Sequence, residues 1–209
     1  MIIIINFKDY KESIGKNAIK LAKSLDHQGV WLVVNAIDLK EVIRNVKYSK
    51  IFIENVDPVE LGAYTGSISF PEVKKSKAFG VLINHSENRI KFDKIKRCIK
   101  LAKKYKLKII VSSNSLSEAL KINKLNPDFT AIEPPELIST KNSISMKKPD
   151  LIKRAGLKIK NLVVGAGINT AEDIKIANEF GARGVLISSA IVKSKNPKNK
   201  LNDLVRFKY

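Results

Sequence analysis

The segment NLVVGAGINTAEDIKIANEFGARGVLISSAIV, residues 161–192, contains one complete strand–helix–strand unit. A short apolar run, residues 162–164, enters a glycine-containing turn, and Thr170 with Asp173 has the spacing of a helix N-cap. A second apolar run, residues 185–187, follows the helix. Two apolar runs joined by a helix predict parallel strands connected by a crossover helix.

The same alternation extends over the whole chain. Short β-rich runs occur at residues 2–5, 30–34, 50–53, 79–83, 108–111, 129–132, 162–164 and 185–187. Most of them are apolar throughout, as expected for strands that are covered on both faces. Helical patterns lie between them, except at residues 56–77, where Gly62, Gly66 and Pro71 predict a long loop with only a short helix. Ser115 with Glu118 has the spacing of a capping box that opens the fifth helix.

Eight near-equal strand–helix units predict an α/β fold, a compact (β/α)8 TIM barrel formed as a single domain by residues 1–209. A doubly wound open sheet is the alternative arrangement of such units. At 209 residues the barrel would be smaller than the typical barrel of roughly 250 residues.

The composition is that of a globular protein, with 44% hydrophobic and 28% charged residues. No apolar run approaches the roughly 18 residues that span a bilayer, so we expect no membrane partner and a cytoplasmic location. Cys98 is the single cysteine, which excludes an internal disulfide. Its helical spacing with Ile95, Ile99 and Ala102 predicts a buried thiol in the core.

The net charge of +19 raises the question of nucleic-acid binding. Only six of the 39 basic residues are arginine, the side chain suited to bidentate recognition, and aromatic residues make up only 7%. We therefore expect no specific nucleic-acid partner. The positive field would instead attract a small anionic substrate.

A barrel places functional side chains just after the carboxyl ends of its strands. The residues at those positions are Asn6, Lys8, Asn35, Glu54, Asn55, Asn84, His85, Ser86, Glu87, Ser112, Ser113, Glu133, Gly165, Ala166, Gly167, Ser188 and Ser189. Among them, Glu133 ends a buried run and is followed by two prolines. That pattern fits either a surface charge before a stiff turn or a catalytic base at the start of a hinge.

His85 is one of two histidines, and its distance in sequence from His27 gives no metal-ligand spacing, so we expect no metal. Residues 86–89, SENR, look like a helix start. Helix N–H groups would lower the pKa of His85 and leave a neutral imidazole that donates a hydrogen bond.

Two stretches of small residues point to an anion. Gly165 and Gly167 follow the seventh predicted strand, while Ser188 and Ser189 follow the eighth. Loops at these places in a barrel commonly present backbone N–H groups to a phosphate. Several phosphate-binding barrels share this feature, so it does not specify a reaction.

Six blocks, in order along nearly the whole chain, resemble the triosephosphate isomerase family in its short archaeal form. They are NFK at 6–8, GAYTG at 62–66, INHSENR at 83–89, AIEPPELIST at 131–140, GAGINT at 165–170 and SSAIVK at 188–193. The resemblance implies a cofactor-independent isomerase of triose phosphates, acting through an enediolate.

The resemblance also implies roles for individual residues. Glu133 would be the base and His85 the electrophile, while Lys8 and Asn6 would bind substrate and stabilise the enediolate. The other implied residues are Ile138 and Ser139 in the lid, Gly167, Ser188 and Ser189 at the phosphate, Glu87 as the partner of Lys8, and Thr65 in a loop that enters a neighbouring subunit. A homo-oligomer follows, with a tetramer favoured over a dimer.

The sequence departs from the family mainly in the lid. It reads ISTK where the family has IGTG, so Ser139 and Lys141 replace glycines that reach positive φ without strain. A short connection after Glu133 predicts a curtailed helix near residues 148–155. The readings that stay open are another phosphate-binding barrel enzyme, such as a sugar-phosphate enzyme, or a degenerate phosphosugar-binding protein.

Overall fold

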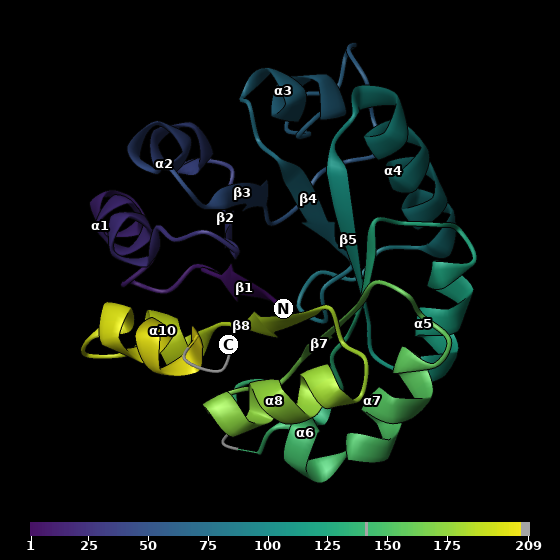
Figure 1. Cartoon of the computed structure of the whole chain (residues 1–209). Helices are drawn as coiled ribbons and strands as arrows, with labels where there is room; N and C mark the ends of the chain where they lie inside the picture. The colour runs from purple at the N-terminus through teal and green to yellow at the C-terminus, as the bar shows by residue number, and fades with distance from the viewer. Residues whose placement is uncertain (141, 206–209) are drawn as a thin grey trace.

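The computed structural model describes residues 1–140 and 142–205. The described residues form a closed barrel of eight parallel strands in the order of the sequence, surrounded by helices (Figure 1). The strands are β1 (Ile2–Asn6), β2 (Val30–Val34), β3 (Lys50–Ile53), β4 (Gly80–Ile83), β5 (Lys108–Ser113), β6 (Phe129–Ile132), β7 (Leu162–Gly165) and β8 (Gly184–Ile187). Since β1 pairs with β8, the predicted barrel is confirmed and the open sheet is excluded.

The helices cover the outside of the barrel. They are α1 (Lys16–Leu25), α2 (Leu39–Asn45), α3 (Phe70–Lys75), α4 (Phe92–Tyr105), α5 (Leu116–Asn123), α6 (Ile144–Lys147), α7 (Pro149–Gly156), α8 (Ala171–Glu179), α9 (Ser189–Val192) and α10 (Pro197–Val205), with a 3-10 turn η1 (Pro135–Leu137). The short helix of the third connection is confirmed as α3, and the curtailed sixth helix as α7, with eight residues. None of the helices in the described ranges is long and apolar enough to cross a bilayer.

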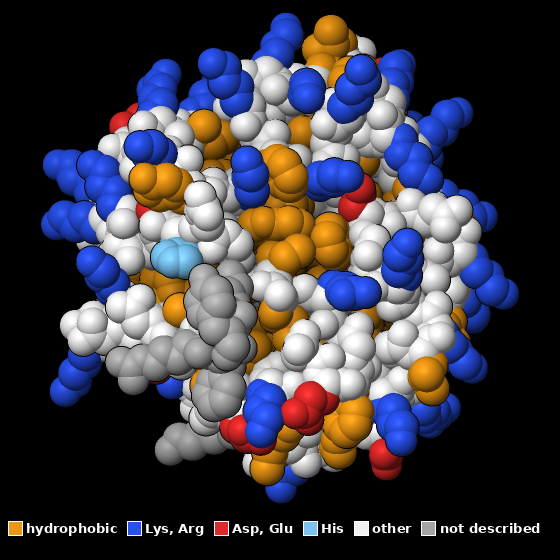
Figure 2. Space-filling view, viewed as in Figure 1, with side chains coloured by type: hydrophobic (Ala, Val, Ile, Leu, Met, Phe, Trp, Pro, Cys, Tyr) orange, Lys and Arg blue, Asp and Glu red, His pale blue; other side chains and the backbone are white. Residues whose placement is uncertain are grey.

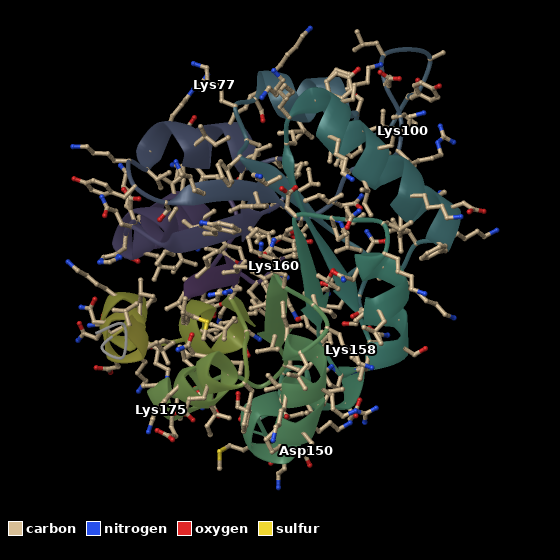
Figure 3. All side chains as sticks on the ribbon, turned by 45° about the vertical axis from the view of Figure 1, so that its right-hand side comes forward. Lys77, Lys100, Asp150, Lys158, Lys160 and Lys175 are labelled. Atoms are coloured by element: carbon tan, nitrogen blue, oxygen red, sulfur yellow. The ribbon has the colours of Figure 1, made fainter. Side chains whose placement is uncertain are left out.

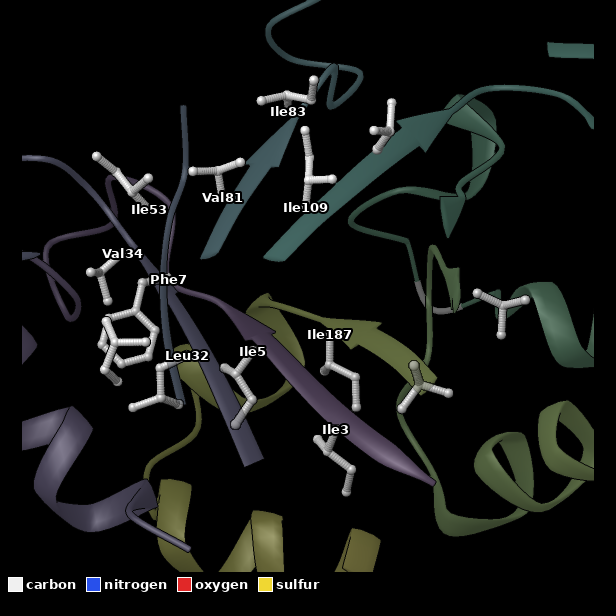
Figure 4. Close-up of a cluster of buried hydrophobic side chains, with 14 of the residues drawn as sticks. Ile3, Ile5, Phe7, Leu32, Val34, Ile53, Val81, Ile83, Ile109 and Ile187 are labelled. Carbon is white, nitrogen blue, oxygen red and sulfur yellow. The ribbon is translucent and has the colours of Figure 1, made fainter. Parts of the chain in front are cut away.

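Two apolar layers follow from the alternation of side chains along each strand. Ile3, Ile5 and Phe7 belong to the layer between barrel and helices (Figure 4). Ile4 and Phe52 belong to the cluster that fills the barrel interior. Cys98 lies in the outer layer, fully buried as predicted, and burial raises the pKa of its thiol to about 12.

Aromatic rings close the amino-terminal end of the barrel. Trp31 stacks on Phe52 at 5.0 Å between ring centroids and meets Phe129 edge-on at 5.2 Å. Gly80 makes room for this cluster, since a Cβ there would lie 2.4 Å from Cε1 of Phe52. The glycine at the start of β4 is therefore a packing requirement.

The two predicted helix caps have different outcomes: the cap at Thr170 is confirmed and the reciprocal box at Ser115 is not. Thr170 and Asp173 form a complete capping box, in which each side chain accepts a hydrogen bond from the other residue's backbone N–H. Ser115 caps α5, but the Glu118 carboxylate accepts from the N–H of Asn114 and pairs with Arg89 instead. The predicted reciprocal box at Ser115 is therefore wrong, because tertiary contacts take the glutamate.

Part of the large positive charge has a local structural explanation. Basic residues occupy the last turn of α1, α2, α3, α4, α5 and α7. A cation at that place interacts favourably with the negative end of the helix dipole. Lys and Arg side chains project around the face shown in Figure 2, and Lys77, Lys100 and Lys175 point outward in Figure 3.

Thr130 in β6 has a buried hydroxyl group. It is 1% exposed, and Oγ1 finds no hydrogen-bond partner among the described residues. Its neighbours Phe129 and Ala131 belong to the interior cluster, so alternation directs Thr130 toward the helices. An unpaired buried hydroxyl costs free energy relative to an apolar group of the same shape.

We expect Thr130→Val to raise the free energy of unfolding by about 1 kcal/mol, because it replaces this hydroxyl with an isosteric methyl group. Urea unfolding measures the change. The matched control is Ser113→Ala, since Ser113 Oγ donates to the Ala131 carbonyl at 2.6 Å and its loss should destabilise. A Thr130→Val protein less stable than the wild type would contradict the prediction.

Candidate active site

A cavity of about 230 Å³ opens at the carboxyl end of the strands. Its lining includes Asn6, Lys8, His85, Glu133, Ile138, Ser139, Gly167, Ser188 and Ser189. These are all nine residues that the sequence predicted to meet the substrate. They come from β1, the β4–α4 and β6–α6 connections and the loops after β7 and β8, so the barrel brings distant parts of the chain together.

Lys8 has a left-handed backbone, with φ of 49°. The Asn6 side chain accepts its N–H at 3.2 Å, and Ser13 Oγ donates to the carbonyls of Phe7 and Lys8. The ammonium Nζ of Lys8 lies 2.6 Å from Oε1 of Glu87, as predicted for this pair. Strained backbone held by surrounding hydrogen bonds is common where a side chain has to be aimed.

His85 is oriented by its own turn. The Glu87 N–H donates to Nδ1 at 3.3 Å, so Nδ1 is an acceptor and the proton of the neutral ring is on Nε2. Nε2 lies 3.6 Å from Oε2 of Glu133. The imidazole therefore presents an N–H donor to the cavity, beside the carboxylate.

The predicted lowering of the His85 pKa is wrong. Burial lowers the pKa of His85, but the Glu133 carboxylate and, more weakly, Glu87 raise it, and the net result is a raised pKa. The expected helix does not start after His85, because residues 85–88 form a turn in which the Asn88 N–H donates to the His85 carbonyl, and α4 begins at Phe92. The N–H groups that would have opposed protonation are thus not provided by a helix.

Glu133 is 4% exposed and follows β6 directly. Its backbone N–H donates to the Ser113 carbonyl at 2.9 Å, and Ser112 Oγ donates to Oε1 at 2.9 Å. On the other side, a Cβ at Gly165 would lie 2.7 Å from Oε2. Gly165, predicted as a phosphate-binding glycine, instead makes room for the carboxylate, and η1 from Pro135 fixes the chain that follows.

The sequence placed Ser112 at the carboxyl end of a strand but indicated no catalytic or binding role for it. The only available signal was its place at the end of the fifth strand, because its contact with Glu133 depends on the pairing of β5 with β6. Glu54 is a second such residue. Burial and the nearby charge of Asp9 raise its pKa to about 7, and its Oε1 has no partner among the described residues.

The loops after β7 and β8 form the far wall of the cavity. Ala166 and Gly167 have left-handed backbone, with φ of 78° and 69°. Ser188 precedes α9, and its buried Oγ finds no hydrogen-bond partner among the described residues. The N–H groups of Ser189 and Ala190 belong to the first turn of a helix, where no intrahelical acceptor exists. This wall can therefore donate several hydrogen bonds to an anion.

The predicted lid follows η1. Ser139 has φ of 59°, so a serine occupies backbone that favours glycine. The Thr140 hydroxyl donates to the Leu137 carbonyl at 2.9 Å. Lys141, the second predicted departure from the family, lies outside the described residues.

The end of this segment is tied to the anion wall. Ile144 donates its N–H to the Ala166 carbonyl at 3.1 Å, and the Ser143 hydroxyl bonds to the buried Asp173 carboxylate. Asp173 also accepts from the N–H of Thr170 at 2.8 Å. One carboxylate therefore connects the lid to the helix that follows the β7 loop.

Thr65 does not line this cavity. It lies in an exposed loop, beside Tyr64 at 49% and close to Leu61 at 72% exposure. Of the predicted site residues, Glu87 lies at the edge of an adjoining cavity of about 350 Å³, which shares Asn6, Lys8 and His85 with the first. Thr65 is thus the one site residue that the fold leaves apart.

The geometry predicts the titration of His85. Its pKa should lie above the ordinary value of about 6.5, and Glu133→Gln should lower it by removing the charge that favours the imidazolium. ¹H–¹⁵N NMR of the ring against pH measures both values, with His27→Gln to assign the two histidines. A midpoint that does not move in Glu133→Gln would mean that this carboxylate is not the cause.

Comparison with known proteins extends over the same residues. The family model described as triosephosphate isomerase matches residues 1–208. The triosephosphate isomerase of Methanothermus fervidus is 36% identical over 216 residues, covering 98% of this chain and 97% of the relative. That of Saccharolobus solfataricus is 39% identical over 214 residues, covering 98% and 94%. That of Methanocaldococcus jannaschii is 33% identical over 219 residues, covering 99% and 100%.

Proposed function

The chain belongs to the triosephosphate isomerase family and is an isomerase, and from that premise we propose how its residues interconvert dihydroxyacetone phosphate and D-glyceraldehyde 3-phosphate. The observation that carries the proposal is the convergence of Asn6, Lys8, His85 and Glu133 on one cavity. A carboxylate and an imidazole N–H that stand 3.6 Å apart are the pair that proton abstraction beside a carbonyl requires.

Glu133 is the base in this proposal. Its carboxylate takes a proton from one carbon of the substrate and returns it to the neighbouring carbon. The proton of the substrate hydroxyl passes to the former carbonyl oxygen, so the carbonyl moves from one carbon to the next. A proton next to a carbonyl is too weakly acidic for a carboxylate alone, so the negative charge that develops on oxygen must be stabilised. Burial of Glu133 keeps water from competing for the proton.

His85, Lys8 and Asn6 provide that stabilisation. The Nε2–H of His85 donates to the carbonyl oxygen, and the Lys8 ammonium lies where Glu87 holds it. The side-chain oxygen Oδ1 of Asn6 already accepts the backbone N–H of Lys8. The side-chain NH₂ of Asn6 is therefore left for the substrate. Each preorganised donor of this kind is worth roughly 10²–10³ in rate.

The substrate phosphate binds the wall formed by Gly167, Ser188 and Ser189. Backbone N–H groups and the Ser188 hydroxyl donate to it, and Ile138 with Ser139 covers it from the lid. The net charge of +19 adds long-range attraction for a dianionic substrate. The mechanism calls for no metal and no cofactor.

A homo-oligomer in the cytoplasm completes the proposal. The exposed loop that carries Thr65, with Leu61 and Tyr64, offers apolar surface to a second subunit. We favour a tetramer over a dimer, although each added interface brings positively charged subunits together. The molar mass measured by light scattering decides between these states.

Glu133→Gln should lose isomerisation by about 10³-fold or more while the fold is kept, because the base is removed and its shape is retained. Exchange of the substrate proton with solvent, followed by NMR, should disappear as well. The matched control is Glu172→Gln on the exposed face of α8, which should leave both rates unchanged. Proton exchange near the wild-type rate in Glu133→Gln would show that another group is the base.

Ser139→Gly should reduce the methylglyoxal formed per turnover. Methylglyoxal arises when the enediolate loses its phosphate, and a well-closed lid prevents that loss. Glycine adopts φ of 59° without the cost of about 1 kcal/mol that serine bears, so the lid holds its conformation more easily. Ser139→Ala is the control, because it keeps the Cβ and should match the wild-type ratio. Equal ratios in all three proteins would mean that this strain does not affect closure.

A further inference from the structure

The Glu133 carboxylate lies in a slot between the strands on either side of β6. Ser112 of β5 donates to Oε1 at 2.9 Å, and Gly165 of β7 leaves the space that Oε2 occupies. His85 faces Oε2 at 3.6 Å. The two oxygens of one carboxylate therefore have different partners, a hydroxyl on the wall and an imidazole in the cavity.

The contact with His85 cannot persist during the reaction. The ring has one proton on Nε2, because Nδ1 accepts the Glu87 N–H, and a substrate oxygen needs that proton. Oε2 must therefore turn away from His85 when substrate enters. Ser112 is not subject to this competition, since it is 1% exposed and does not line the cavity.

We propose that Ser112 is a positioning residue for the base: its hydroxyl holds Oε1 against the barrel wall while Oε2 turns from His85 to the substrate carbon. The inference rests on the proposed function of Glu133. It assigns no proton transfer to Ser112, whose hydroxyl keeps its proton throughout.

The backbone of Ser112 supports the same role. Its carbonyl accepts the Asn84 amide at 2.8 Å, and Asn84 directly precedes His85. The Ser112 side chain thus binds the base Glu133, and the Ser112 main chain binds Asn84, the residue before the electrophile His85. Ser112 therefore fixes the distance between the two catalytic groups, and rates depend steeply on such distances.

Ser112→Ala tests the proposal by removing only the hydroxyl. We expect kcat to fall about 10-fold with KM nearly unchanged, because an interaction needed in the transition state is lost while substrate binding is kept. Ser112→Cys retains a side chain of similar size with a weaker donor, so kcat should fall less in this variant than in Ser112→Ala. The matched control is Ser113→Ala. Among the described residues the Ser113 hydroxyl bonds to the Ala131 carbonyl alone, so kcat of this variant should equal that of the wild type.

A second measurement requires no substrate. Without the Ser112 donor the carboxylate charge interacts more strongly with His85, so the NMR titration midpoint of His85 should move to higher pH in Ser112→Ala and stay in place in Ser113→Ala. Equal kcat in Ser112→Ala and wild type, or equal losses in Ser112→Ala and Ser113→Ala, would overturn the proposal. A wild type without isomerase activity would instead reject the proposed function, and the His85 titration would still test the hydrogen bond.

If Ser112→Ala fails to fold, Ser112→Cys carries the test, because the thiol fills the space of the hydroxyl. A native Ser112→Cys protein with reduced kcat and a raised His85 midpoint supports the positioning role. If a natively folded Ser112→Cys protein has the kcat and the His85 titration midpoint of the wild type, the positioning role is overturned.

Discussion

Closure of the barrel is the constraint on which the whole site depends. Parallel pairing of β1 with β8 sets Ile5 opposite Ile187, so Asn6 and Ser188 lie at the ends of neighbouring strands although they are near opposite ends of the chain. The same rule brings Ser112, Glu133 and Gly165 together at the ends of β5, β6 and β7. Because every strand runs in one direction, all functional side chains gather at one rim and the opposite rim is left for packing.

The two ends of the interior show how stability and function are divided. At the amino-terminal end, aromatic rings fill the barrel, and Gly80 is small so that Phe52 fits. At the carboxyl end, Gly165 is small so that a buried carboxylate fits. A charge at this depth is costly unless it is hydrogen-bonded, which explains why Ser112 and His85 both face Glu133.

Sequence reasoning succeeded where the signal was local or came from a whole motif. Apolar runs predicted the strands, and the six blocks that resemble the family predicted the residues of the cavity. It failed where a neighbour in space decides the outcome. The pKa of His85 depends on Glu133 in another strand, the partner of Glu118 is Arg89 rather than its own helix, and the function of Gly165 depends on the Glu133 side chain. Each of these contacts joins residues that are far apart in the sequence, so no local sequence pattern indicates it.

Backbone strain separates the two rims as well. Among the described residues other than glycine, positive φ occurs at Lys8, Lys77, Asn84, Lys106, Asn126, Ser139 and Ala166. Lys106 is the C-cap of α4, a place where left-handed backbone ends helices routinely. Lys8, Ser139 and Ala166 line the cavity instead, and each bears a cost of about 1 kcal/mol or more. No helix ends at these three residues, so helix capping does not account for their left-handed backbone. We attribute it to the aiming of side chains and N–H groups at the substrate. Burial in the apolar layers on both sides of the barrel wall offsets its cost in free energy.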